Sequence, residues 1–171
     1  MFFHSNLNLR DAMTIDRNVL ILGIGNTLLR DEGAGIHALN QLRDMLGEHD
    51  DITYMDGGTL SFTLAGPIEE ATHLIVLDAA QLNQTPGHWQ LFEGAQMDTF
   101  LGSNRKRSVH EVSLIDLMAI ALLTDHLPQQ RALIGIQPGV IDWGEFPSAA
   151  VAAAMPQICQ QTMQLIEEWR L

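Results

Sequence analysis

The apolar positions of this chain form short continuous runs separated by longer segments with helical spacing. Continuous apolar runs bounded by turn residues are typical of strands buried on both faces of a sheet. Five segments are predicted strands on this basis: residues 18–24, 52–56, 74–77, 88–92 and 132–136. The segment 88–92 differs because it alternates apolar and polar side chains after a Pro86-Gly87 turn, which indicates an edge strand and is compatible with an antiparallel one.

The segments between these runs carry apolar side chains three and four positions apart, which predicts helices. The predicted helices cover residues 33–46, 59–70, 109–123 and 147–171. Thr59 is a candidate cap, Gly66-Pro67 is expected to break or kink the second helix, and Pro156 is expected to bend the last. In the third helix we expect the core-facing side chains to be Val112, Ile115, Met118 or Ala119, and Leu122. Residues 94–107 are predicted to be a loop, or a loop with a short helix.

This alternation of strands and helices predicts an α/β fold: a single domain built on a five-stranded sheet. The chain has 171 residues, of which 46% are hydrophobic and 18% charged, as expected of one globular domain. We expect residues 1–17 to be an N-terminal extension without fixed structure, with Met1 and Met13 both candidate starts, and residues 18–171 to form the domain. Residues 1–17 contain no apolar export signal, and no apolar run approaches the roughly 20 residues that cross a bilayer, so we expect a cytoplasmic protein.

The formal net charge of −12 argues against nucleic acid as a partner, because such binding requires a basic face. The one basic cluster, Arg105-Lys106-Arg107, is interpreted as a solvated loop, with a role in steering an acidic partner segment as the alternative. Cys159 is the only cysteine, which excludes an intrachain disulfide and a cysteine-based metal site. Because nothing basic flanks it, we expect Cys159 to pack in the core rather than to act as a nucleophile.

The segment 20–35 is the most informative part of the chain. An apolar strand leads into Gly23-Ile24-Gly25-Asn26 and then into Arg30-Asp31-Glu32-Gly33. Glycine-rich turns after a strand usually hold phosphate, but two carboxylates would repel a phosphate and instead favour a cation. The dinucleotide fingerprint is also broken, since Leu28 stands where the third glycine is required, and no Walker lysine follows Gly25.

Three side chains are candidates for chemistry: Glu32 after the first strand, Asp78 at the end of the third, and His110 at the start of a helix. Ligands of open α/β sheets bind at the carboxyl ends of the strands, where these loops meet. Two carboxylates and an imidazole would suit a divalent ion such as nickel or zinc. Structural alternatives exist: Asp31 or Glu32 could complement the helix dipole, and Asp78 could cap the following turn. His110 lies within Ser108-Val109-His110-Glu111, a predicted capping box that would hold it in the first helical turn with its ring free.

Other candidates are weaker. Asp56, before Gly57-Gly58, is either a turn former or a residue of the pocket lining. His37 is predicted to lie on the surface, and Gln137-Pro138-Gly139 is a candidate for the pocket wall. The Gly-x-Ser-x-Gly elbow is absent, and Leu114 stands where a helical zinc protease would have its second histidine.

These residues resemble those of the nickel–iron hydrogenase maturation endopeptidases. The matching segments, from about Asn18 to Arg170, occur in family order: Gly23-Ile24-Gly25-Asn26, Leu29-Arg30-Asp31-Glu32-Gly33, Asp56-Gly57-Gly58-Thr59, Leu77-Asp78-Ala79, Val109-His110-Glu111 and Gly135-Ile136-Gln137-Pro138. The glycine-rich segment with Asp31-Glu32 is the most specific of them. The resemblance implies a twisted, mostly parallel sheet between helices and a monomer that meets its substrate transiently.

The resemblance further implies that Glu32, Asp78 and His110 bind metal, and that the enzyme removes a C-terminal peptide from the hydrogenase large-subunit precursor. The nickel would come with the precursor rather than being a resident cofactor. Either the ion assists cleavage, with Asp78 or Glu32 as catalytic base, or a metal-independent pair of carboxylates cleaves as in aspartic proteases. Specificity is expected in surface loops such as 94–107. The alternatives are a nickel-dependent checkpoint or chaperone protein that does not cleave, and a nucleotide-binding module that uses the glycine turn.

Overall fold

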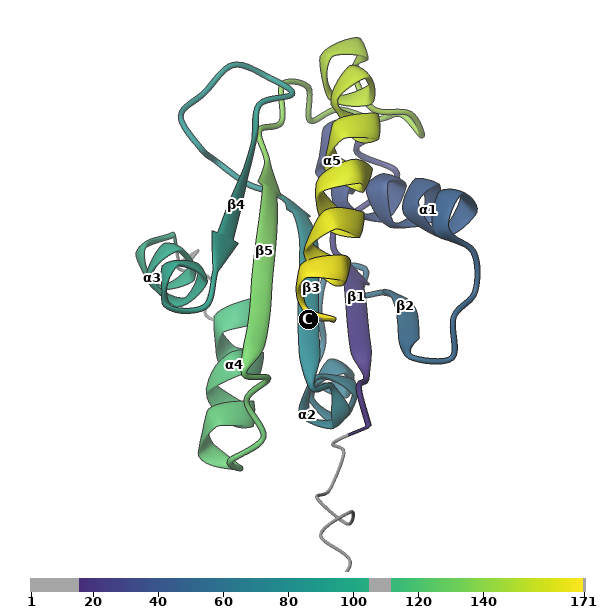
Figure 1. Ribbon diagram of the computed structural model, residues 1–171. Coiled ribbons are helices and arrows are strands. Elements are labelled where there is room, and N and C mark those ends of the chain that lie inside the picture. The colour runs from purple at the N-terminus through teal and green to yellow at the C-terminus, as the bar shows by residue number, and fades with distance from the viewer. Residues whose placement is uncertain (1–15, 105–111, 171) are drawn as a thin grey trace, which may run out of the picture.

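The computed structural model describes residues 16–104 and 112–170, which contain one five-stranded sheet. The strands are β1 (Val19–Gly23), β2 (Ile52–Asp56), β3 (His73–Ala79), β4 (Trp89–Glu93) and β5 (Gln130–Ile136). Their order is β2-β1-β3-β5-β4; β2, β1, β3 and β5 are parallel, whereas β4 pairs antiparallel with β5 at the edge (Figure 1). The predicted α/β class, the five strands and the edge position of β4 are confirmed.

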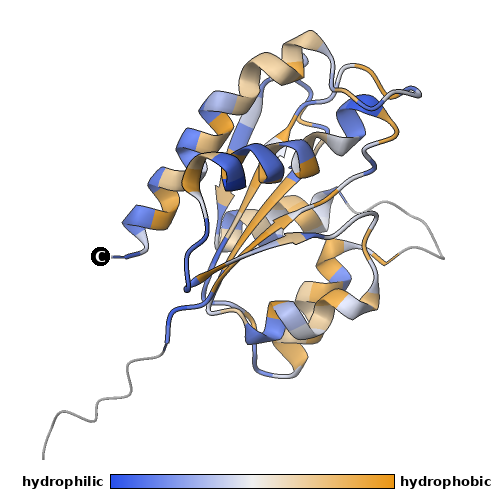
Figure 2. Ribbon diagram, turned by 90° about the vertical axis from the view of Figure 1, so that its right-hand side faces the viewer, coloured by the Kyte–Doolittle hydropathy of each residue, from blue (hydrophilic) through white to orange (hydrophobic). Residues whose placement is uncertain are grey.

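Helices cover both faces of the sheet. They are α1 (Ala34–Leu46), α2 (Ala65–Glu70), α3 (Ala95–Ser103), α4 (Leu114–Leu123) and α5 (Ala149–Glu168), with short 3-10 helices η1 (Arg30–Gly33) and η2 (Phe62–Leu64). Helices α1 and α5 lie over one face, and α2, α3 and α4 over the other (Figures 1 and 2). The sheet therefore forms the middle of three layers, as expected for a mostly parallel sheet.

The two faces of the sheet supply two separate hydrophobic cores. In β1, Val19 and Ile21 pack into the core beneath α1 and α5, while Leu20 and Leu22 pack into the core beneath the other helices. Successive side chains of a strand point to opposite faces, so a strand covered on both sides must be apolar throughout. Figure 2 shows the strands as a predominantly hydrophobic layer between helices that carry hydrophilic residues.

The second predicted helix begins later than expected. Leu60 donates its backbone N–H to the carbonyl oxygen of Gly57 and has a positive φ of 70°, so residues 57–60 form a turn. A helix cannot begin at Thr59 within that turn, and α2 starts only at Ala65, after η2. Pro67 then falls in the first helical turn, where a missing N–H costs nothing, so it does not break the helix.

The start of α4 also differs from the prediction. Ser113 has extended backbone angles and forms a capping box with Asp116, so the helix begins at Leu114 rather than at 109. The predicted box at Ser108 and Glu111 lies outside the described residues. Ser113-Leu114-Ile115-Asp116 matches the same Ser-x-x-acid pattern, a second candidate cap that the prediction did not consider.

The buried face of α4 also differs from the predicted one. The buried side chains are Leu114, Leu117, Met118 and Ala121, whereas Leu122 is 63% exposed. The prediction of Leu122 as a core residue is therefore wrong, and Ala119 is exposed as well. Met118 and Val112 pack in or against the core, as predicted.

The remaining helices follow their predictions closely. In α1, Ile36, Leu39 and Leu42 are buried, and the predicted short helix within 94–107 is α3. In α5, Val151, Met155, Ile158 and Leu165 are buried, and Cys159 packs among them. No helix in the described parts of the chain is long and apolar enough to cross a membrane.

Candidate functional site

The carboxyl ends of the parallel strands meet at one edge of the sheet, and the loops that follow them are joined by backbone hydrogen bonds. Ile24, after β1, donates its N–H to the Leu77 carbonyl of β3 over 2.9 Å. Gly25 donates to the Gly58 carbonyl, and Gly57 donates to the Gly23 carbonyl, both over 2.8 Å. The glycine turn is thus fixed between the ends of β2 and β3, at the edge where α/β folds place their ligands.

Two glycines let the chain approach itself closely at this edge. A Cβ on Gly25, which has a φ of +137°, would lie 1.9 Å from the carbonyl oxygen of Glu32. A Cβ on Gly35 would lie 2.0 Å from the carbonyl oxygen of Leu77, the residue before Asp78. Gly25 therefore allows the glycine turn to pack against η1, and Gly35 allows the start of α1 to pack against the end of β3, a role in close packing rather than in phosphate binding.

This packing brings two of the three candidate residues to the same edge. Glu32 lies in η1, which contacts β3, and Asp78 lies near the end of β3; both side chains are partly exposed. His110, the third candidate, lies outside the described residues. Residues 16–104 and 112–170 contain no group of three His, Cys, Asp or Glu side chains that could hold a metal ion. A three-ligand site at this edge thus depends on a residue beyond that part of the chain, and His110 is the candidate.

Asp31 has a different role from its neighbour Glu32. Its side chain is fully buried, and its Oδ2 accepts hydrogen bonds from the N–H groups of Gly139 and Val140, each over 2.8 Å. Ser148 donates its N–H to Oδ1 over 2.6 Å and its hydroxyl to Oδ2 over 2.8 Å. Asp31 therefore binds the loop 137–148, and the sequence interpretation that it complements the helix dipole does not describe its main partners.

These hydrogen bonds also set the charge state of Asp31. Burial by itself raises the pKa of this carboxyl, but the three backbone N–H groups and the Ser148 hydroxyl outweigh it and hold the pKa below 3.8. Asp31 is thus a buried carboxylate whose negative charge is held by oriented donors. Sequence reasoning missed this role because the hydrogen-bond partners of Asp31 lie more than 100 positions away in the chain. The only local sign of a special role was the presence of a second acid directly beside Glu32.

Gln137 performs a similar task for the loop after β3. Its side chain is buried, and its Oε1 accepts N–H groups from Leu82 over 2.8 Å and Gln84 over 3.3 Å. Its Nε2 donates to Gln81 Oε1 and to the carbonyl oxygen of Pro138. Gln137 therefore anchors the segment that directly follows Asp78, a more specific role than the predicted pocket wall.

Three other residues can now be interpreted. Asp56 accepts the Gly58 N–H over 2.8 Å, which matches the turn-forming alternative. His37 is half-buried rather than on the surface: burial lowers its pKa, and its Nε2 has no hydrogen-bond partner among the described residues. Cys159 is fully buried, as predicted, and burial raises its pKa to about 11.

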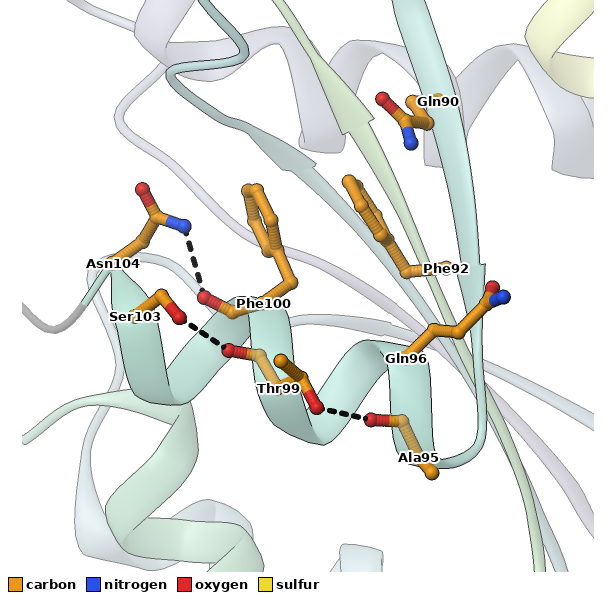
Figure 3. A pocket seen from close by; sticks show the side chains of 8 residues that line it. All are labelled: Gln90, Phe92, Ala95, Gln96, Thr99, Phe100, Ser103 and Asn104. Carbon is orange, nitrogen blue, oxygen red and sulfur yellow. Dashed lines mark hydrogen bonds between the residues drawn. The ribbon is translucent and has the colours of Figure 1, made fainter.

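An open depression of about 570 Å³ lies elsewhere, between β4 and α3 (Figure 3). Among its lining residues, Phe92 and Phe100 stack with ring centroids 4.1 Å apart. The Ser103 hydroxyl donates to the Thr99 carbonyl within helix α3. None of the eight lining residues carries an acid or an imidazole, so this depression lacks the groups of a metal-assisted or carboxylate-catalysed hydrolysis.

Comparison with known proteins identifies one family. The family model HycI, described as hydrogenase maturation protease, matches residues 36–165. The hydrogenase expression/formation protein HupD of Bradyrhizobium diazoefficiens is 33% identical over 155 residues, covering 90% of this chain and 80% of that protein. The hydrogenase 2 maturation protease of Escherichia coli is 26% identical over 151 residues, covering 88% and 91%.

Solved structures share the fold. The hydrogenase maturating endopeptidase HybD of Escherichia coli superimposes with a TM-score of 0.79 at 25% identity, covering 88% of this chain and 93% of that one. The maturation protease HycI of Thermococcus kodakarensis has a TM-score of 0.71 at 20% identity, covering 92% and 97%, which shows the fold alone. With the family model spanning most of the sheet and its helices, the chain belongs to the hydrogenase maturation protease family.

Proposed function

We propose that this protein is an endopeptidase that removes the C-terminal peptide of a nickel–iron hydrogenase large-subunit precursor after nickel insertion. Glu32, Asp78 and His110 recognise the nickel carried by the precursor. The observation that carries this proposal is the packing of η1 against the end of β3, which gives Glu32 and Asp78 a common edge in a chain of the maturation protease family. The names of the Escherichia coli relatives, a maturation protease and a maturating endopeptidase, support proteolysis as the activity.

Two carboxylates and one imidazole suit a borderline divalent ion and leave coordination positions open. The precursor's own ligands fill those positions, so the ion joins enzyme and substrate. A precursor without nickel lacks this contact and binds more weakly, which makes cleavage conditional on metal insertion. Nickel is thus part of the substrate, not a cofactor of the enzyme.

Hydrolysis of the peptide bond needs an activated water and a polarised carbonyl. Either the substrate's ion polarises the carbonyl and Asp78 or Glu32 takes the proton from water, or the two carboxylates act as an aspartic-type pair. An Asp78→Asn variant distinguishes the two roles that Asp78 could have, catalytic base or metal ligand. If it binds nickel-loaded precursor as wild type does but does not cleave, Asp78 is the base; if binding is lost, Asp78 is a ligand.

The test of the function is the intact mass of the precursor from the same organism, incubated with the protein with and without loaded nickel. We expect loss of one C-terminal peptide only from the nickel-loaded sample. We expect Asp78→Asn and His110→Ala to abolish that loss while the circular dichroism spectrum stays unchanged, with His88→Ala as the histidine control. Normal processing by both variants would refute the assignment of the site.

The alternative functions predict different results. Nickel-dependent binding of a precursor that keeps its full mass would indicate a checkpoint protein instead of a protease. Thermal stabilisation by NAD or ATP would indicate a nucleotide-binding module. We expect neither nucleotide to stabilise the protein, because Asp31 and Glu32 occupy the turn that a phosphate would need. We also propose a monomer with a transient substrate complex, which light scattering with and without precursor can test.

A further inference from the structure

An exposed apolar surface adjoins the edge that carries Glu32. Trp143 and Phe146 are 78% and 76% exposed, unusually high for aromatic side chains on a well-packed domain. Together with three aliphatic neighbours they form what is called here the apolar surface: Leu28, Val140, Ile141, Trp143 and Phe146. It lies on the loops 24–33 and 137–148, beyond the carboxyl ends of the strands, where Figure 2 shows hydrophobic loop segments near the start of α5.

Backbone hydrogen bonds hold the two loops together. Gly144 donates its N–H to the Leu28 carbonyl over 3.0 Å, and Arg30 donates its own to the Gly144 carbonyl over 2.9 Å. Asp31 donates its N–H to the Val140 carbonyl over 3.1 Å, while its buried carboxylate binds the same loop from within. The apolar side chains are therefore presented on a fixed backbone, and little ordering entropy is lost when a partner covers them.

The position of this surface relative to Glu32 follows from the same bonds. Arg30 and Asp31, which bind the loop 137–148, directly precede Glu32 in η1. A folded protein substrate whose scissile segment reaches Glu32 can therefore also cover the apolar surface. Exposed aromatic side chains beside a site of reaction are typical of the centres of protein interfaces.

The charges around the surface indicate what kind of partner fits. Asp142 and Glu145 are exposed and alternate with Trp143 and Phe146 in the loop, on a chain with a net charge of −12. An apolar patch with an acidic rim is complementary to an apolar patch with a basic rim. The aromatic side chains stand out on loops, which suits the broad surface of a folded partner rather than an extended peptide.

We propose that the apolar surface is the docking site for the folded body of the hydrogenase large-subunit precursor, which meets it with apolar side chains bordered by basic ones. This inference rests on the proposed function and adds the region that binds the substrate away from the scissile bond. The removed peptide contacts the edge at Glu32 and Asp78, while most of the binding energy comes from the contacts with Trp143 and Phe146.

The test compares Trp143→Ser/Phe146→Ser and the single variant Phe146→Ser with Leu123→Ser. Leu123 is the matched control because it is 87% exposed and ends α4, which leads to the opposite edge of the sheet. The affinity for nickel-loaded precursor from the same organism and the kinetics of its cleavage are measured separately. We expect the Kd and KM of the double variant to rise about tenfold or more, the single variant to be intermediate, and kcat at saturation to change less than about twofold. The control keeps wild-type values.

A failure of the docking site and a failure of the protease function give different results. If wild type cleaves and both variants keep its Kd and KM, the docking site is refuted while the proposed function stands. If wild type binds the precursor without cleaving it, and binding is lost in the double variant, the protease function fails while the docking site stands. A further variant, Asp142→Lys, tests the charge argument. We expect it to associate with the precursor more slowly than wild type at low salt, and at the same rate as wild type at high salt. Unchanged association at low salt would refute the basic rim.

Discussion

Ser148 donates two hydrogen bonds to Asp31, a residue 117 positions earlier in the sequence: its N–H binds Oδ1 over 2.6 Å and its hydroxyl binds Oδ2 over 2.8 Å. Ser148 is also the residue before α5, and its side chain makes no capping bond to that helix. Asp31 thus takes the hydroxyl that would otherwise cap α5. This pair connects η1, which also carries Glu32, to the start of the last helix.

Replacing Asp31 by Asn is expected to lower the free energy of unfolding by about 3 kcal/mol. An amide cannot accept from all four donors, and its own NH₂ group would face N–H groups, so buried donors lose their partner. Urea denaturation at pH 7 measures the change. Asp142→Asn, an exposed substitution in the connected loop, should leave the unfolding midpoint unchanged; equal midpoints for the two variants would contradict the role assigned to Asp31.

The contribution of Asp31 should disappear in acid. Its pKa in the folded protein lies below the ordinary value of 3.8, so the unfolded chain takes up the proton first as pH falls. The stabilisation is therefore fully present above pH 3.8 and is lost as pH falls through the folded pKa. Urea denaturation of wild type and Asp31→Asn between neutral and acid pH should show the difference shrinking over that range. A pH-independent difference would mean that charge does not contribute to the role of Asp31.

Substitution of Gly35 by Ala tests the packing of α1 against β3. The added Cβ would lie 2.0 Å from the Leu77 carbonyl oxygen, a backbone atom that cannot rotate away. We expect a loss of about 3 kcal/mol in the free energy of unfolding, together with reduced processing because Glu32 and Asp78 are displaced. Gly66→Ala in α2, where nothing lies within 4 Å, is the control and should stabilise the protein by about 0.5 kcal/mol. Equal stability of the two variants would refute the close approach.

Cys159 should be unreactive in the folded protein. Its thiol is fully buried, burial raises its pKa to about 11, and it lies 3.7 Å from the Ala38 carbonyl oxygen. Since the thiolate is the reacting form, we expect a thiol reagent to modify the protein only in denaturant, and iodoacetamide to leave processing unaffected. Fast modification of the native protein, or loss of activity with iodoacetamide, would contradict both the burial and the choice of carboxylates as catalytic groups.

Much of the fold could be predicted from local patterns. Val19–Gly23 and Leu74–Leu77 are continuous apolar runs, the pattern typical of strands that are covered on both faces. Because parallel strands end at one edge, the same pattern predicts that Glu32 and Asp78 share a common edge. The buried face of α4 could not be predicted in this way, because Leu114–Leu123 is apolar at every position except Asp116, and only the tertiary packing selects Leu117, Met118 and Ala121 for the core.

The sequence by itself determined the strands, the glycine turn and the edge at which reactive groups gather, since each depends on neighbours within a few residues. Only the tertiary structure decided which of two adjacent acids is structural. Asp31 is buried because its donors, Gly139, Val140 and Ser148, come from a distant loop, whereas Glu32 remains partly exposed. Backbone hydrogen bonds of Gly144 with Leu28 and Arg30 likewise hold the loop that carries Trp143 against the segment 28–30. Hydrogen bonds between segments so far apart leave no periodic trace in the sequence, because they depend on how the strands are ordered in the sheet.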